Sequence, residues 1–272
     1  MDILLCPVCG GPLQKSEAAY RCRSGHSFDR ARSGYVNLLP PTAGGKRHGD
    51  DRLMVRARTE FLNRGYYALL ADAVADCAAD SAPQGSVIVD VGCGEGYYTQ
   101  RVWERLCAAG AAPTLVGVDI SKEALIGAAR RSKDWTLCAA SAAHLPLADE
   151  SADLLLNIFS PLEAAEFARV LKPNGRLLRV LPLEGHLWEL KELIYEQPYR
   201  NPAPEEKLDG FHLLHRRDVR CTVSLRSGED IMALFRMTPY YYKTGAHDQE
   251  KAARACALDT RAEFGLLLYE KA

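Results

Sequence analysis

Apolar residues recur along this chain with two alternating periods. In residues 53–80 they return every three or four positions, which predicts two helices with a break near residues 63–65. Residues 87–91 instead form a short apolar run before a glycine, typical of a buried strand. The alternation continues downstream, with predicted strands at residues 115–119, 137–139, 153–158, 176–181, 221–225 and 264–269 and predicted helices at residues 162–171 and 186–196. This pattern predicts an α/β fold, in which a mostly parallel sheet with an antiparallel last strand is covered on both faces.

A glycine-rich turn, DVGCGEGYY, follows the strand predicted at residues 87–91 and precedes a helix. Gly92, Gly94 and Gly96 allow a tight turn and a close approach of the backbone to a ligand at the helix N-terminus. Asp119 ends the next predicted strand, where an acidic residue accepts hydrogen bonds from ribose hydroxyls. Many strand-to-helix turns carry glycines for backbone reasons alone, but the combination favours a site for a cofactor that contains a ribose.

Four metal-ligating side chains lie near the N-terminus: Cys6, Cys9, Cys22 and His26. Three thiolates and one imidazole at this spacing are the ligand set of a tetrahedral zinc site, and four protein ligands leave no open position for a substrate. A redox CxxC pair and an accidental spacing are the alternatives, but the sequence GGP after Cys9 opposes the helix that a redox pair needs. We therefore predict a structural zinc ribbon.

The stretch PPTAGGKRHGDD at residues 40–51 has no periodic apolar pattern and predicts a linker. It separates a zinc ribbon at residues 1–39 from an α/β domain at residues 52–272. The net charge of -1 hides an asymmetry, because the front of the chain is basic and the remainder is acidic. Cations and aromatic rings mix around the last two ligands, namely Tyr20, Arg21, Arg23, Phe28, Arg30, Arg32 and Tyr35. Such a mixture suits RNA phosphates and unstacked bases, and a solvated basic face is the alternative.

Composition limits the environment of the protein. A hydrophobic content of 47% supports an ordinary buried core. No stretch approaches the ~18 uninterrupted apolar residues of a membrane helix, and the start of the chain lacks a basic segment followed by a long apolar run. We therefore expect a cytoplasmic protein without membrane contact. Nine cysteines are an odd number, and several lie in apolar runs, which predicts free thiols rather than a disulfide framework.

Several segments together resemble one family. They are CPVCGGPL, CRSGHSFDRARSGYVNLLP, residues 49–67, DVGCGEGYYT, NIFSP, GHLWELKELIY and MTPY. The glycine-rich turn resembles motif I of class I S-adenosylmethionine-dependent methyltransferases. The whole set resembles the bacterial 23S ribosomal RNA (guanine-N1) methyltransferases of the RlmA type, which include macrolide-resistance relatives. The resemblance implies a Rossmann-like sheet of seven strands, and transfer of a methyl group from S-adenosylmethionine to N1 of a guanine in a 23S ribosomal RNA hairpin loop. It also implies that the zinc ribbon helps to recognise the RNA.

The resemblance also assigns ligands residue by residue. Cys6, Cys9, Cys22 and His26 would bind structural Zn²⁺, and the expected contacts to S-adenosylmethionine are Tyr67, Asp90, Gly92, Gly94, Glu95, Gly96, Asp119, Ser141 and His186. Several have a purely structural alternative. Tyr67 would serve as a core aromatic, Glu95 as a first-turn acid favoured by the helix dipole, and His186 as a residue at a helix start. Ser141 stands where many class I enzymes place an aspartate against adenine.

The motif NIFSP follows a predicted strand at the sheet edge where ligands bind in such folds. Asn157 and Phe159 are candidates to position or stack the guanine, and strand-end packing is the alternative. The sequence identifies neither the acceptor of the guanine N1 proton nor the modified guanine. A small-molecule methyltransferase and a non-catalytic zinc-bearing RNA-binding protein are the alternative functions. The oligomeric state stays open, with a homodimer among the alternatives.

Overall fold

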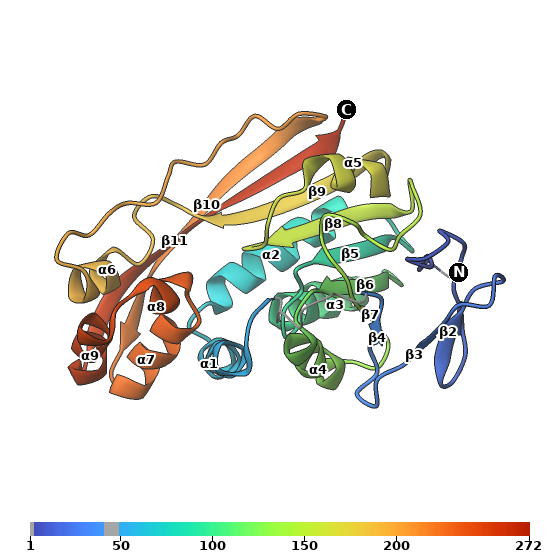
Figure 1. The fold of residues 1–272 in the computed structure, drawn as a ribbon. Helices are drawn as coiled ribbons and strands as arrows, with labels where there is room; N and C mark the ends of the chain where they lie inside the picture. Colours follow the sequence, from blue (N-terminus) through green and yellow to red (C-terminus); the bar gives the residue numbers. More distant parts are fainter. Residues whose placement is uncertain (1–2, 41–48) are drawn as a thin grey trace.

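A central twisted sheet organises the computed structural model, which describes residues 3–40 and 49–272 (Figure 1). Within these residues the sheet has eight strands, in the spatial order β10, β11, β9, β8, β5, β6, β7, β4. In chain order they are β4 (Val36–Asn37), β5 (Val87–Val91), β6 (Thr114–Asp119), β7 (Thr136–Ala139), β8 (Ala152–Ile158), β9 (Leu171–Pro182), β10 (Phe211–Leu225) and β11 (Leu258–Lys271). All adjacent pairs from β9 to β4 are parallel, whereas β11 is antiparallel to both of its neighbours. The predicted mixed sheet with an antiparallel last strand is thus confirmed.

The eighth strand was not predicted. The strands from β5 to β11 make up the expected set of seven, and β4 joins them from the N-terminal segment. It pairs in parallel with β7, with Val36 opposite Cys138. A strand of two residues carries no periodic signal, so only the folded chain reveals it.

Helices cover both faces of the sheet. They are α1 (Arg52–Asn63), α2 (Ala68–Ser81), α3 (Tyr97–Ala108), α4 (Lys122–Arg131), α5 (Ala164–Val170), α6 (Trp188–Ile194), α7 (Gly228–Arg236), α8 (Pro239–Lys243) and α9 (Ala246–Arg254). The break between α1 and α2 falls around Gly65, as the sequence predicts, and its φ of 83° is one that glycine adopts readily. Neighbouring β5 residues face opposite cores, because Ile88 packs in one apolar cluster and Val89 in another. The helices α6 to α9 gather at the end of the sheet farthest from the N-terminal strands (Figure 1).

Two other elements differ from the prediction. Residues 172–175, which precede the strand predicted at 176–181, belong to β9 as an irregularity in its pairing, which shifts from Ala152 opposite Leu171 to Leu154 opposite Arg176. The strand predicted at residues 221–225 is only the end of the much longer β10. The charged residues of β10 resemble a loop, but this strand has β11 as its one neighbour, and an edge strand tolerates exposed charge.

The N-terminal segment packs directly on the sheet. Its strands β1 (Gln14–Lys15), β2 (Ala19–Arg21) and β3 (Ser27–Asp29) form an antiparallel sheet. Leu4 and Leu13 are buried in the same apolar cluster as Val89 of β5. Backbone bonds reinforce this contact, since the Leu5 N–H donates to the Pro146 oxygen at 2.8 Å. The ribbon and the large sheet therefore share one hydrophobic core.

Residues 41–48 of the predicted linker at 40–51 lie outside the described residues, and the division of the chain at this linker stays a prediction. In the part of the chain that the structure describes, no helix has both the length and the apolar character needed to cross a membrane. No disulfide joins the cysteines, all nine of which lie in the described residues.

Candidate functional site

The four predicted zinc ligands converge at the tip of the ribbon. Their ligand atoms all lie within 4.8 Å of one another. The Cys6 Sγ to His26 Nδ1 distance is 3.6 Å, the Cys22 Sγ to His26 Nδ1 distance is 3.3 Å, and the Cys9 and Cys22 sulfurs are 3.6 Å apart. Tetrahedral zinc with its usual bond lengths separates such atoms by about 3.5–3.8 Å. The four side chains therefore fit Zn²⁺, and because they complete a tetrahedron the metal would be structural.

Two tight turns bring these ligands together. The Gly10 N–H donates to the Cys6 oxygen at 2.8 Å, and the Gly25 N–H donates to the Cys22 oxygen at 3.1 Å. Both glycines have positive φ, 71° and 88°, which L side chains rarely adopt. The GGP sequence, which argued against the helix of a redox site, thus ends the first turn.

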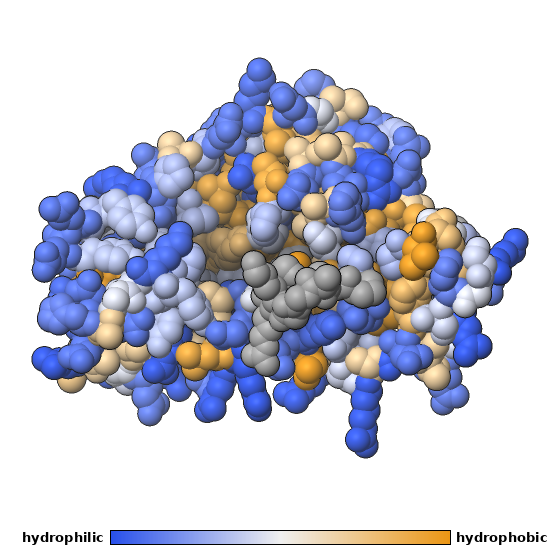
Figure 2. Space-filling view, viewed as in Figure 1, coloured by the Kyte–Doolittle hydropathy of each residue, from blue (hydrophilic) through white to orange (hydrophobic). Residues whose placement is uncertain are grey.

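A cavity of about 830 Å³ opens where the parallel strands end. Figure 2 shows apolar side chains recessed in the middle of this face of the molecule. The wall combines the turns after β5, β6, β7 and β8 with residues along α1, the end of β9 and the residues around the start of α8. The carboxyl edge of a parallel sheet is where ligands bind in this type of fold.

Hydrogen bonds connect the glycine-rich turn to the end of β6 at the floor of this cavity. The Gly94 N–H donates to Asp119 Oδ2 at 2.8 Å, and the Ser121 N–H donates to Asp119 Oδ1 at 2.7 Å. Burial raises the pKa of Asp119, and the two backbone donors oppose that rise. Each carboxylate oxygen has a second lone pair that a ligand hydroxyl can use.

Gly92 has no space around it for a side chain. A side chain at this position would collide with Ser160, whose Oγ would be 2.8 Å from the added carbon. The Ser160 hydroxyl donates to the Val91 oxygen at 2.6 Å and accepts from Asn157 Nδ2, also at 2.6 Å. The glycine-rich turn therefore packs against the NIFSP turn with no room between them.

Comparison with known proteins then identifies the chain. Residues 4–44 match the family described as RlmA, N-terminal, and residues 89–179 match a methyltransferase domain. The 23S rRNA (guanine(748)-N(1))-methyltransferase of Streptomyces fradiae is 40% identical over 195 residues, which cover 70% of this chain and 67% of that protein. The chain belongs to the 23S rRNA (guanine-N(1)-)-methyltransferase family.

Two more members support this assignment. A protein of that name from Micromonospora griseorubida is 40% identical over 208 residues, covering 69% of this chain and 68% of the relative. One from Bacillus subtilis (strain 168) is 32% identical over 247 residues, covering 86% and 85%. The protein is therefore an S-adenosylmethionine-dependent class I methyltransferase with a zinc ribbon, as the sequence resemblance implied.

Nine of the eleven sequence-predicted site residues outside the zinc cluster line the cavity of this methyltransferase. They are Tyr67, Gly92, Gly94, Glu95, Asp119, Ser141, Asn157, Phe159 and His186. Asp90 and Gly96 do not reach the wall. Asp90 is 1% exposed and accepts a 2.5 Å hydrogen bond from Thr99 Oγ1. Gly96 packs against α4, where an added carbon would lie 3.2 Å from Ala128 Cα. Both support the turn from either side, because Asp90 lies in β5 before it and Gly96 caps α3 after it.

Glu95 and His186 have well-defined partners. The Glu95 carboxylate pairs with Arg131 of α4, whose Nε lies 2.9 Å from Oε2, so this acid is already neutralised. Burial lowers the pKa of His186 to about 3, so its ring is neutral at physiological pH. His186 Nδ1 accepts from the Glu263 N–H at 3.2 Å, which leaves the ring proton on Nε2. His186 is therefore a hydrogen-bond donor at this wall.

Two tyrosine hydroxyls add polar groups to the apolar wall. The ring of Tyr67 packs edge-on against Phe264, with centroids 5.0 Å apart, which is the core role considered from sequence. The hydroxyls of Tyr67 and Tyr98 are buried and have no hydrogen-bond partner among the described residues. Buried polar groups are normally satisfied, so both hydroxyls are available to a bound ligand.

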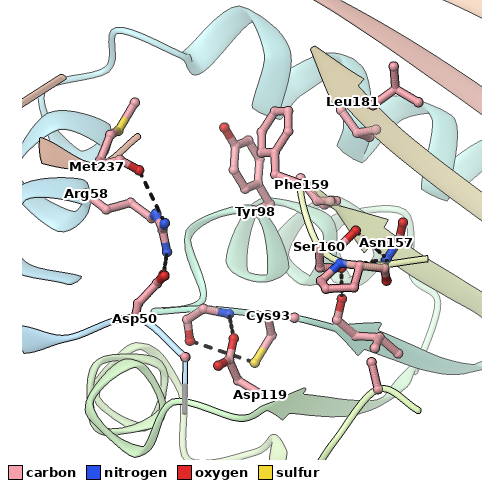
Figure 3. Close-up of a pocket in the computed structure, with 18 of the residues that line it drawn as sticks. Asp50, Arg58, Cys93, Tyr98, Asp119, Asn157, Phe159, Ser160, Leu181 and Met237 are labelled. Carbon is pink, nitrogen blue, oxygen red and sulfur yellow. Dashed lines mark hydrogen bonds and ion pairs between the residues drawn. The ribbon is translucent and has the colours of Figure 1, made fainter. Parts of the chain in front are cut away.

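The NIFSP turn presents one aromatic ring to the cavity. Phe159 is 44% exposed and has a φ of 55°, a strained conformation for a bulky residue. Its ring stands beside Tyr98 in Figure 3, with centroids 6.0 Å apart. Asn157 Nδ2 is held by Ser160 Oγ and by the Pro161 oxygen at 3.0 Å, which directs Oδ1 the other way.

Sequence reasoning missed Arg58, Asp50 and Met237, which meet at one side of the cavity (Figure 3). Arg58 is a cation on an amphipathic helix, and such a residue is usually a solvated one. Asp50 lies in the predicted linker, and Met237 comes from the far end of the chain. No local pattern brings these three residues together, so only the tertiary fold reveals them.

Proposed function

We propose that this protein transfers a methyl group from S-adenosylmethionine to N1 of a guanine in a hairpin loop of 23S ribosomal RNA. The observation that carries the proposal is one cavity with a fixed carboxylate, Asp119, at its floor and an exposed aromatic ring, Phe159, at its mouth. The names of the related proteins specify guanine N1 of 23S rRNA as the methylated position. A ribosomal substrate accords with a cytoplasmic location.

The floor of the cavity suits the cofactor. Asp119 would accept hydrogen bonds from the ribose hydroxyls, beside the Gly94 backbone. The cavity residue Ser141 follows β7 and would meet the adenine, while Tyr67 and the Nε2–H of His186 would donate to the remaining polar atoms. The bound cofactor supplies an activated methyl group on its sulfonium, so the protein contributes alignment and exclusion of water.

The mouth of the cavity suits a base turned out of an RNA loop. Phe159 would stack on the guanine, and Asn157 Oδ1 would accept a hydrogen bond from the Watson–Crick edge. As the N1–C bond forms, the S–CH₃ bond breaks and the N1 proton is released. Three acids of the cavity wall have partners of their own: Asp50 pairs with Arg58, Glu95 with Arg131, and Asp119 with two N–H groups.

The zinc ribbon would help to hold the RNA. It carries Arg21 at the end of β2 and Arg23 and Arg32 in its loops, and all three arginines are exposed. Cations of this kind bind phosphates without reading sequence. The oligomeric state, with a homodimer among the alternatives, and any effect on macrolide sensitivity stay open.

Tritium transfer tests the function directly. Labelled S-adenosylmethionine is incubated with the protein and with 23S RNA from a strain that lacks this gene, and the base is mapped by the reverse-transcription stop that N1 methylation causes. We expect label in a single loop guanine. Label in small molecules instead of RNA would favour the small-molecule alternative, and RNA binding without any transfer would favour the non-catalytic one.

Phe159→Ala sharpens this test. Base stacking is worth about 1–3 kcal/mol, so we expect kcat/KM for RNA to fall about 5- to 150-fold while cofactor affinity stays unchanged. Tyr199→Ala is the matched control, because Tyr199 is similarly exposed but lies outside the cavity. Equal losses in both variants would contradict a stacking role.

A further inference from the structure

Arg58 places a cation beside the glycine-rich turn. Its guanidinium reaches from α1 toward Gly94, where an added carbon would lie 3.8 Å from Nη1. Figure 3 shows this group between Asp50 and Met237, above the strand end that carries Asp119. The positive charge acts on the cavity, because it lowers the pKa of Asp119 and opposes the rise that burial causes.

The guanidinium is held in a fixed orientation. Nη1 is ion-paired with Asp50, and Nη2 donates to the Met237 oxygen at 3.5 Å. Asp50 is fixed in turn, because its backbone oxygen accepts from Ser121 Oγ at 2.7 Å. A guanidinium has more N–H donors than these two bonds use. The side chain is 26% exposed, so a ligand bound in the cavity can reach those donors.

S-adenosylmethionine ends in an amino acid whose carboxylate needs a cationic partner in a largely apolar cavity. His186 is neutral, and Arg131 is paired with Glu95. Arg179 lines the cavity from β9 opposite Asn157, at the end that suits the guanine. Of the two arginines that line the cavity, Arg58 and Arg179, Arg58 is the one beside Gly94.

We propose that Arg58 binds the α-carboxylate of the methionine part of S-adenosylmethionine, and that Asp50 orients the guanidinium for this contact. The inference rests on the cofactor of the proposed function and is independent of its RNA substrate. Arg58 would fix the amino-acid end of the cofactor while Asp119 fixes the ribose, so the sulfonium between them is aligned at two points.

Two ligands distinguish this role from a structural one. S-adenosylhomocysteine carries the carboxylate, whereas 5′-methylthioadenosine keeps the adenosine and sulfur but lacks the amino acid. Isothermal titration calorimetry of Arg58→Met should show about 10- to 100-fold weaker binding of S-adenosylhomocysteine, with binding of 5′-methylthioadenosine unchanged. Arg56→Met is the control, because Arg56 lies on the same helix, is 77% exposed and pairs with Glu60. Neither ligand should respond to it.

Any result in which folded Arg58→Met does not selectively weaken S-adenosylhomocysteine binding overturns the proposal. Equal weakening of both ligands would show that Arg58 only supports the fold of the cavity. Unchanged binding of both ligands with lower RNA methylation would assign Arg58 to the RNA. If Arg58→Met does not fold, Arg58→Lys retains a cation beside Asp50 without the planar fork, and should weaken only S-adenosylhomocysteine, about 3- to 10-fold. Failure of the wild-type protein to methylate RNA would refute the proposed function and leave this ligand difference intact.

Discussion

Asp90 gives the stability of this protein a specific pH dependence. The side chain is 1% exposed, and its Oδ1 has no hydrogen-bond partner among the described residues. Burial raises the pKa of Asp90 to about 7, whereas an aspartate in the unfolded chain has a pKa of about 3.9. Between these two values the folded protein binds a proton that the unfolded chain has released. Stability from this group is therefore fully present below pH 4 and is lost as pH rises through 7.

The size of this effect follows from linkage. Each pH unit in that interval costs about 1.4 kcal/mol, so about 4 kcal/mol is lost between pH 4 and pH 8. Asp90→Asn removes the charge and keeps an oxygen that can accept from Thr99 Oγ1. In the wild-type protein this hydroxyl lies 2.5 Å from Asp90 Oδ2. The stability of this variant relative to wild type should rise by about 2.6 kcal/mol from pH 5 to pH 8.

Urea unfolding followed by circular dichroism at pH 5, 6, 7 and 8 measures this difference for both proteins. Other titrating groups cancel, because both chains contain them. A difference in unfolding free energy that stays constant across the series would refute the reasoning, whatever its absolute value. Since Asp90 lies beneath the cavity wall, Asp90→Asn should also bind S-adenosylhomocysteine as tightly as wild type does.

Two further predictions concern the surroundings of the cavity. Cys22→Ser should lose zinc, as measured by atomic emission. It should also weaken S-adenosylhomocysteine binding in calorimetry, because the ribbon pairs with β7 and with the segment after it. Unchanged affinity would mean that the ribbon acts as a separate unit. Gly92→Ala should lower the unfolding free energy by several kcal/mol in urea unfolding, because the added carbon clashes with Ser160. Gly110→Ala is the control, since Gly110 has a similar φ of 77° and an added carbon there meets nothing within 4 Å. This variant should cost only about 1–2 kcal/mol of unfolding free energy. Equal costs would contradict the clash.

The sequence predicted those features that local spacing encodes. The zinc ligands come in two short pairs joined by tight turns, and the order of strands and helices follows from apolar periodicity. Asp119 could be placed because it ends a strand next to the glycine-rich turn. Contacts between distant residues were beyond this reasoning. Arg58 meets Met237 across most of the chain, and its partner Asp50 lay in a segment read as a linker.

The sequence also left open the direction in which each side chain of a motif points. Asp90 and Gly92 are two residues apart in one motif, yet Gly92 lines the cavity and Asp90 points into the core. A motif gives the position of its members along the chain, but the strand and the turn set which of them face the ligand. The length of β10 was missed for a similar reason, because its polar surface belongs to a strand with a single neighbour.

The short strand β4 shields the backbone of β7. Without it, β7 would be the last strand on this side of the sheet, with its N–H and C=O groups unpaired beside the buried residues Leu137, Cys138 and Ala139. Such a bare, apolar border readily recruits strands from other molecules and leads to aggregation. A catalytic fragment that begins after residue 48 would therefore tend to self-associate. The ribbon thus also protects the enzyme against aggregation.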